Sequence, residues 1–166
     1  SIALQHKGEI TQAVIYEPNR NDLYTATKGR GAFLNDKRIR VSKCDKLQES
    51  LVGTGFPFRD FKHLDTYLGM FKSMLKKTTG IRRPGSAALD LAYVANGSLD
   101  AFWEIGLSPW DIAAGALLVQ EAGGIISNLN GKDGWLESGN VLAASPKIYD
   151  AMVETLAPHL TDDIKN

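Results

Sequence analysis

A carboxylate at the start of an apolar helix is the first chemical signal in this sequence. Asp111 lies in SPWDIAAGALLVQEAGG (108–124), a segment that is otherwise apolar and rich in small residues. The N-terminus of a helix favours a negative charge, so Asp111 suits a helix cap. A carboxylate at the edge of a tight, partly dry pocket, with Pro109 and Trp110 shielding it, would equally hold a hard cation such as Mg²⁺. The residue types and spacing leave both roles open.

A second signal is the start of the preceding predicted helix. Gly85, Ser86 and Ala87 open the segment GSAALDLAYVANG (85–97). The first backbone N–H groups of a helix have no partner within the helix, so they can bind the oxygens of a ligand. An ordinary serine N-cap after a Pro-Gly turn explains the same residues, and this alternative stays open.

A third signal is Glu104, which ends the apolar segment LDAFWE (99–104). A glutamate that follows two aromatic residues needs a polar partner. A polyhydroxylated substrate would be one partner, and the arginines at 82–83 would be another. Together, two helix starts and two carboxylates at strand ends indicate a polar site where an α/β sheet meets its loops.

The segments that must position these residues alternate between strand and helix patterns. The β-rich residues 1–42 contain a tight turn at 6–9 and a hairpin over 34–38, and we expect them to be the remaining antiparallel strands of an N-terminal sheet domain. Residues 43–166 are expected to form a C-terminal α/β domain. Its predicted strands are 50–56, 99–104, 125–129 and 141–144, and its predicted helices are 63–77, 87–95, 112–122 and 148–156. The predicted fold class is α/β, in a layered α+β arrangement.

The N-terminal strands need other elements to bury the apolar faces of their sheet. An antiparallel sheet of this kind cannot bury both of its faces by itself and needs helices or a second sheet. The chain also begins with Ser1 and enters a strand at once. Removal of an initiator Met would also explain Ser1, but the uncovered strands favour the tail of a longer protein whose missing part covers one face of the sheet.

Composition excludes several classes of protein. Lys and Arg together number 19, as do Asp and Glu, so no basic excess indicates a nucleic-acid surface. Hydrophobic residues make up 43% and charged residues 23%, which is typical of a globular domain. The single Cys44 excludes an intrachain disulfide framework. No apolar run is long enough to span a membrane, and we expect a cytoplasmic protein with no membrane partner.

Several blocks resemble the inositol monophosphatase family over nearly the whole chain. WDIAAGALLVQEAGG (110–124) is similar to the C-terminal signature of the family, and GSAALDLAYVANG (85–97) and DAFWEIG (100–106) resemble the blocks before it. Residues 14–42 resemble the strand-rich middle of the family, and GTGFPF (53–58) is most similar to its bacterial SuhB branch. The resemblance implies an inositol-monophosphatase-like sugar phosphatase fold that lacks its N-terminal segment.

The resemblance also implies a chemistry. Members hydrolyse phosphate monoesters such as inositol 1-phosphate with Mg²⁺, are inhibited by lithium, and are commonly homodimers. The family motifs match Asp111 to a catalytic metal ligand and Glu104 to a ligand of inositol hydroxyls. They match Gly85, Ser86 and Ala87 to the helix start that contacts the sugar ring.

The sequence departs from the family in one important respect. The family has an Asp-Pro-Ile/Leu-Asp-Gly-Thr motif and an earlier Glu-Glu pair, which supply most of the metal ligands, and neither is present here. The nearest candidates, Asp36 and Asp60, have the wrong neighbours. We therefore expect this chain alone to be inactive or nearly so.

Two alternatives to inositol phosphate hydrolysis stay open. Relatives with the same signature act on other sugar or nucleotide phosphates. The SuhB branch resembles proteins that join a ribosomal RNA transcription antitermination complex, a binding role that needs no phosphatase chemistry.

Overall fold

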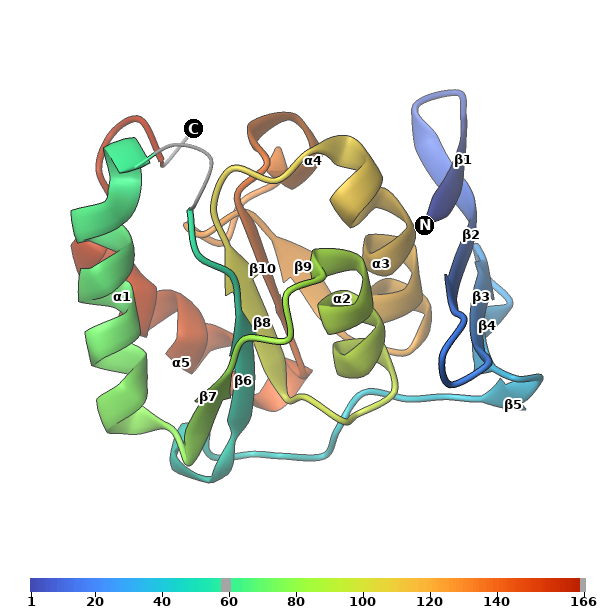
Figure 1. The fold of residues 1–166 in the computed structure, drawn as a ribbon, viewed down its shortest axis with the longest axis horizontal. Coiled ribbons are helices and arrows are strands. Elements are labelled where there is room, and N and C mark those ends of the chain that lie inside the picture. Colours follow the sequence, from blue (N-terminus) through green and yellow to red (C-terminus); the bar gives the residue numbers. More distant parts are fainter. Residues whose placement is uncertain (58–60, 165–166) are drawn as a thin grey trace.

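Two five-stranded β-sheets and their helices build the structure, a computed structural model that describes residues 1–57 and 61–164. The first sheet is an antiparallel meander with the strand order β1-β2-β3-β4-β5 (Figure 1). Its strands are β1 (Ile2–His6), β2 (Glu9–Glu17), β3 (Asp22–Thr27), β4 (Gly31–Leu34) and β5 (Lys37–Arg38). The positive φ angles of Lys7 and Gly8, and of Asn35 and Asp36, make the two tight turns that the sequence predicts.

The second sheet is mixed and has the strand order β7-β6-β8-β10-β9. Its strands are β6 (Leu51–Thr54), β7 (Gly80–Arg82), β8 (Ala101–Glu104), β9 (Ile125–Ser127) and β10 (Val141–Ala144). Strands β7 and β8 both run parallel to β6, whereas β10 is antiparallel to β8 and β9. The carboxyl ends of β7, β6 and β8 therefore lie at one edge of this sheet.

The helices divide into two layers (Figure 1). α2 (Ala87–Ala95) and α3 (Pro109–Glu121) lie between the two sheets, and α1 (Leu64–Lys77) and α5 (Pro146–Leu156) cover the other face of the second sheet. The shorter helices are η1 (Leu47–Glu49), η2 (Phe61–His63), α4 (Trp135–Ser138) and η3 (Ala157–His159). One apolar core fills the space around α2 and α3, and a second lies between the second sheet and the α1–α5 layer.

Small residues allow α3 to approach α2 closely. A Cβ atom at Gly115 of α3 would lie 2.5 Å from the Cβ of Leu91 on α2, so only glycine fits there. At its other end, α3 holds the first sheet through Glu121. Its Oε1 accepts a hydrogen bond from the Gly29 amide at 2.6 Å, and its Oε2 accepts one from Gly31 at 2.7 Å. The helix that carries Asp111 in its first turn is thus fixed to both α2 and the first sheet.

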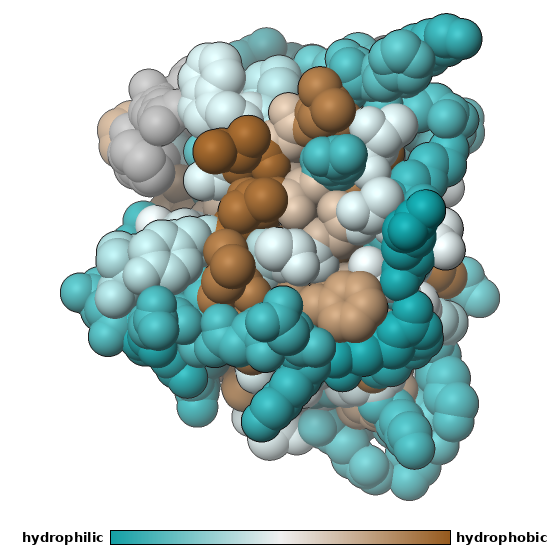
Figure 2. Space-filling view, turned by 90° about the vertical axis from the view of Figure 1, so that its right-hand side faces the viewer, coloured by the Kyte–Doolittle hydropathy of each residue, from teal (hydrophilic) through white to brown (hydrophobic). Residues whose placement is uncertain are grey.

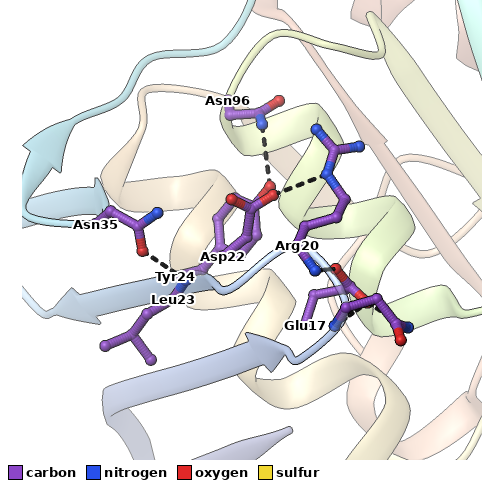
Figure 3. Close-up of polar contacts among 8 residues, drawn as sticks. Glu17, Arg20, Asp22, Leu23, Tyr24, Asn35 and Asn96 are labelled. Carbon is purple, nitrogen blue, oxygen red and sulfur yellow. Dashed lines mark hydrogen bonds and ion pairs between the residues drawn. The ribbon is translucent and has the colours of Figure 1, made fainter.

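A polar cluster joins the first sheet to the end of α2 (Figure 3). The Asn96 side-chain amide donates a hydrogen bond to the Tyr24 hydroxyl at 3.2 Å, and burial raises the pKa of Tyr24 to about 12. Arg20 forms an ion pair with Asp22 at 3.2 Å, while the Arg20 backbone amide donates to Glu17 at 2.7 Å. The turn between β2 and β3 is therefore held in one shape beside α2.

The element boundaries differ from the prediction in several places, and the predicted strands 50–56, 99–104 and 125–129 are each shorter in the structure. The helices predicted at 112–122 and 148–156 begin earlier, at Pro109 and Pro146, because proline is tolerated in the first turn of a helix. The strand β7 was not predicted, because three residues carry too little periodicity. The predicted helix 87–95 is confirmed, with Ser86 at its N-cap.

The outer face of the first sheet is apolar and exposed, as expected of a sheet that cannot cover both faces. Figure 2 looks onto the side of the molecule where this sheet lies and shows hydrophobic residues among polar ones. The exposed apolar side chains of β1, β2 and β3 are Ile2, Leu4, Val14, Tyr16 and Leu23. Within residues 1–57 and 61–164, no helix combines the length and the apolar character that crossing a membrane requires.

Candidate functional site

A cavity of about 440 Å³ opens where β7, β6 and β8 end. Ligand sites of α/β sheets commonly lie beyond the carboxyl ends of their strands. The cavity is lined by Gly55, Phe56, Pro57, His63, Arg83, Gly85, Ser86, Ala87, Glu104, Ile105, Gly106, Leu107 and Asp111. It contains all five residues that the sequence singled out as candidate ligands, although they come from three separate segments of the chain.

Asp111 is the third residue of α3 and lies at the cavity wall. Its Oδ2 accepts a hydrogen bond from the Ser108 backbone amide at 3.1 Å, which closes the first turn of the helix. The N-cap itself is Ser108, and Asp111 lies in the first turn of the helix, as the sequence predicts. Asp111 is half-buried. Its carboxylate can therefore support the helix end and still face the cavity.

Trp110 does not shield Asp111, contrary to expectation. Its side chain is 68% exposed and lines a different hollow, together with Ser1 and residues of β1. The Ser1 hydroxyl donates a hydrogen bond to the Trp110 backbone carbonyl at 3.0 Å. The first residue of the chain therefore contacts the residue that directly precedes Asp111.

Glu104 ends β8 and is only 9% exposed. Its carboxyl group packs directly against Gly55, the first residue after β6, where a Cβ atom would overlap it. Strands β6 and β8 pair in parallel, with Thr54 level with Trp103, which brings these two strand ends together. Glycine at position 55 thus leaves the room that the Glu104 carboxylate occupies.

The start of α2 forms another wall of the cavity. Gly85 has φ +98°, a left-handed conformation that favours glycine, and it turns the chain into the helix. The Ser86 hydroxyl caps α2 by accepting a hydrogen bond from the Leu89 amide at 3.5 Å. The capping explanation of Ser86 is therefore correct. Its backbone and that of Ala87 still line the cavity, so capping and ligand binding are compatible.

Two nitrogen-bearing side chains also line the cavity, Arg83 just after β7 and His63 just before α1. The Arg83 guanidinium lies 5.2 Å from the centre of the Phe56 ring, at the cavity wall. Asp90, on α2, is 1% exposed, and burial raises its pKa to about 7 even though the nearby Arg83 charge lowers it. His63, which precedes α1, also lines the cavity. Its spacing in the sequence gave no sign of this, because His63 comes to the same cavity as Arg83 and Glu104 only in the folded chain.

The residues directly before β10 hold the loop between Glu104 and Asp111 by hydrogen bonds. The Asn140 side chain accepts a hydrogen bond from the Gly106 amide at 3.1 Å, and the Gly139 carbonyl accepts one from Leu107 at 2.8 Å. Asn140 is buried and also donates to the Ile164 carbonyl at 3.3 Å. The sequence did not indicate Asn140 as a residue beside the site, since no neighbouring motif in the chain marks it.

The donors in this cavity do not complete a metal site. Mg²⁺ prefers six oxygen ligands in octahedral geometry. In the described part of the chain, no group of three or more His, Cys, Asp or Glu residues is arranged to hold a metal ion. Asp36 lies in the β4–β5 turn and does not line the cavity. Asp60 lies outside the described residues.

Comparison with known proteins agrees with the fold and the sequence blocks. A sequence model of the inositol monophosphatase family matches residues 1–161. The "Putative Nus factor SuhB" of Neisseria meningitidis serogroup B is 53% identical over 160 residues, which are 96% of this chain and 61% of that protein. The chain thus spans about three fifths of this relative.

Solved structures of similar proteins have the same fold over most of this chain. The extragenic suppressor protein suhB from Bartonella henselae is 42% identical with a TM-score of 0.90, over 93% of this chain and 59% of that chain. The inositol monophosphatase from Anabaena (Nostoc) is 37% identical with a TM-score of 0.90, over 94% of this chain and 64% of that chain. The chain therefore has the α/β fold of these proteins over the part that it covers.

Proposed function

The chain belongs to the inositol monophosphatase family, and from that premise we propose that the whole protein is a Mg²⁺-dependent phosphomonoesterase that hydrolyses inositol 1-phosphate. One observation supports this most: Asp111, Glu104 and the start of α2 line a single cavity, although they are distant in sequence. A small polyol phosphate matches a cavity of about 440 Å³ with both carboxylates and a guanidinium in its wall.

The proposed roles follow from the position of each group. The Glu104 carboxylate, held at the end of β8, accepts hydrogen bonds from ring hydroxyls of the substrate. The backbone N–H groups at Ser86 and Ala87 donate to substrate oxygens, with the helix dipole favouring electron-rich partners. Gly85 allows the close approach of the ring, and Arg83 attracts the anionic substrate to the cavity.

Asp111 is proposed as a catalytic metal ligand. The family is generally metal-dependent, and a bound cation would polarise the phosphoryl group and activate a water molecule. The described residues offer too few donors to hold the cation alone. We therefore assign the remaining ligands to the part of the relatives that this chain does not span, and we expect the chain alone to be inactive or nearly so. Lithium sensitivity and a cytoplasmic location belong to the same proposal.

A chain segment before Ser1 would be well placed to supply those ligands. Ser1 bonds to the Trp110 carbonyl, and Trp110 precedes Asp111. The division into an N-terminal sheet domain of residues 1–42 and an α/β domain of residues 43–166 stays a prediction.

A second candidate function is a binding role in transcription. It is favoured by the names of curated relatives, which are described as Nus factor SuhB. In this case the protein would act as a homodimer or monomer on transcription-complex proteins, without using the cavity. Another sugar or nucleotide phosphate is a further alternative substrate.

Substitution of Asp111 separates these functions. In the protein extended at its N-terminus to the length of its relatives, Asp111→Asn should lower kcat for inositol 1-phosphate by about 100-fold or more, while complex formation with transcription proteins persists. Asp150→Asn, on the exposed face of α5, is the matched control and should leave kcat unchanged. Full phosphate release by the Asp111→Asn variant would refute the proposed role of Asp111.

A further inference from the structure

A second cavity, called here the Arg82 cavity, lies beside the candidate site. Its volume is about 420 Å³, which is within the range of sites for small molecules. Its wall is formed by the turn between β2 and β3, by the end of β7 and by α2 with the loop that follows it. Of the described residues, Arg83 alone lines both this cavity and the candidate site. The two cavities are therefore neighbours with separate walls.

Part of the wall of the Arg82 cavity is a polar cluster whose groups already bind one another (Figure 3). Arg20 and Asp22 form an ion pair, so their charges offset each other. The Asn96 side chain donates to the Tyr24 hydroxyl and accepts a hydrogen bond from the Ser98 backbone amide at 2.9 Å. These contacts fix the shape of the wall and occupy the acceptors of its amide and hydroxyl groups.

The remaining polar groups of the wall can all donate hydrogen bonds, and two of them are positively charged. Arg82 and Arg83 are exposed, and neither forms an ion pair within residues 1–57 and 61–164. Arg82 uses one N–H on the Ile81 carbonyl, and a guanidinium group has five. The Tyr93 hydroxyl forms no hydrogen bond with the described part of the chain. Free donors and positive charge together fit an anion.

The buried Asp90 carboxyl group does not cancel the charge of Arg83. It lies near Arg83 without forming an ion pair, and its Oδ1 has no hydrogen-bond partner in the described segments. Burial raises the pKa of Asp90 to about 7, so at neutral pH the carboxyl group carries only part of a negative charge. Arg83 therefore keeps positive charge that a ligand can use.

Apolar groups form the rest of the wall. Leu34 of β4, Pro84 and Leu99 line the cavity together with the ring of the half-buried Tyr93. An aromatic ring packs favourably against such a surface, and offset stacking on a tyrosine adds to the contact. The wall thus suits a ligand that combines an anionic group with an aromatic body.

We propose that the Arg82 cavity binds a small aromatic phosphate, with Arg82 and Arg83 holding the anionic group and Tyr93 contacting the ring. Planar guanidinium groups bind phosphate oxygens through paired hydrogen bonds. The inference does not depend on the proposed phosphatase activity, because Arg82 and Tyr93 do not line the candidate site.

Calorimetric titration with phenylphosphonate tests the proposal. This probe has a ring and a phosphate-like group joined by a P–C bond, and it is added to the extended protein without Mg²⁺. We expect saturable binding, and Arg82→Ala should raise Kd by about tenfold. Arg82→Lys keeps the charge but loses the paired geometry, so its Kd should lie between these two values. Tyr93→Phe removes the free hydroxyl group and should raise Kd by roughly threefold.

Two controls distinguish the Arg82 cavity from other places where an anion could bind. Arg30→Ala removes an equal charge from an exposed position that does not line the cavity, and Kd should not change. Glu104→Gln removes a negative charge from the candidate site, and Kd should again stay the same. The proposal is overturned if no saturable binding occurs at millimolar probe or if Arg82→Ala leaves Kd unchanged. It is equally overturned if Arg30→Ala weakens binding as much as Arg82→Ala, or if Glu104→Gln tightens it, which would place the probe in the candidate site.

Discussion

At the scale of single residues, the site depends on close contacts that the sequence does not display. Gly55 and Glu104 are far apart in the chain, yet the parallel pairing of β6 and β8 brings the glycine against the carboxylate. Glu104 was predicted as a site residue because a glutamate after two aromatic residues is conspicuous. Arg83 was already considered as a partner of Glu104, but Gly55 and His63 could not be assigned to the same cavity, because that requires the strand order of the second sheet.

Gly55→Ala should displace the Glu104 carboxylate from the cavity wall. The new methyl group would overlap that carboxylate, which is the movable end of a side chain, so the fold should survive. In the extended protein we expect KM for inositol 1-phosphate to rise by about tenfold with a smaller change in kcat, since Glu104 is proposed to bind substrate hydroxyls. Steady-state kinetics measures this. Gly80→Ala, where a methyl group meets only ordinary contacts, is the control, and an equal rise there would contradict the prediction.

Asp90 should make stability depend on pH. Burial raises its pKa from 3.8 to about 7, so between these values the native state binds a proton that the unfolded state has lost. The free energy of unfolding should therefore fall as pH rises through this window and level off above it. The side chain at position 90 cannot ionise in the Asp90→Asn variant. The free energy of unfolding of this variant, minus that of the original chain, should therefore increase by roughly 2–4 kcal/mol from pH 4 to pH 8.

Urea unfolding at several pH values measures the effect of Asp90. The exposed Asp150→Asn variant should follow the pH dependence of the original chain. If Asp90→Asn also follows it, the Asp90 carboxylate is ionised in the native protein over the whole range, and the account of its burial is wrong.

At the scale of elements, the sequence predicted well those helix ends that are determined by contacts within one turn. The start of α2 was found from Ser86 and its end from Gly97, because a cap and a left-handed glycine act within one turn. The start of α3 was placed three residues late, since Pro109 reads as a break although it is favoured in a first turn. The short edge strand β7 is defined only by its pairing with β6, so its own residues could not predict it.

Glu121 is the element-scale contact that fixes α3 to the first sheet. Glu121→Ala would remove the acceptors of the Gly29 and Gly31 amides, and we expect the free energy of unfolding to fall by about 2–3 kcal/mol. Glu154→Ala, on the exposed face of α5, should change it by less than about 0.5 kcal/mol. Denaturant unfolding of both variants measures these changes. An equally small change in the free energy of unfolding for both would show that the two hydrogen bonds contribute little to stability.

At the scale of the whole molecule, the described residues form a first sheet with a bare apolar face and a candidate-site cavity with an incomplete donor set. The sequence predicted both, because the N-terminal strands lack cover and the upstream acidic motifs of the family are missing. The chain spans 61% of its Neisseria relative, which agrees with a missing portion. The location of Ser1 beside Trp110 could not be predicted, since it depends on how β1 packs against α3.

The most direct measurement is phosphate release from inositol 1-phosphate by this 166-residue chain and by the extended protein, each with and without Mg²⁺. We predict Mg²⁺-dependent phosphate release by the extended protein and no release above background by the chain alone. Mg²⁺-dependent turnover by the 166-residue chain would contradict it, because the chain would then build a metal site from its own residues. An extended protein without activity would contradict the proposed phosphatase function itself.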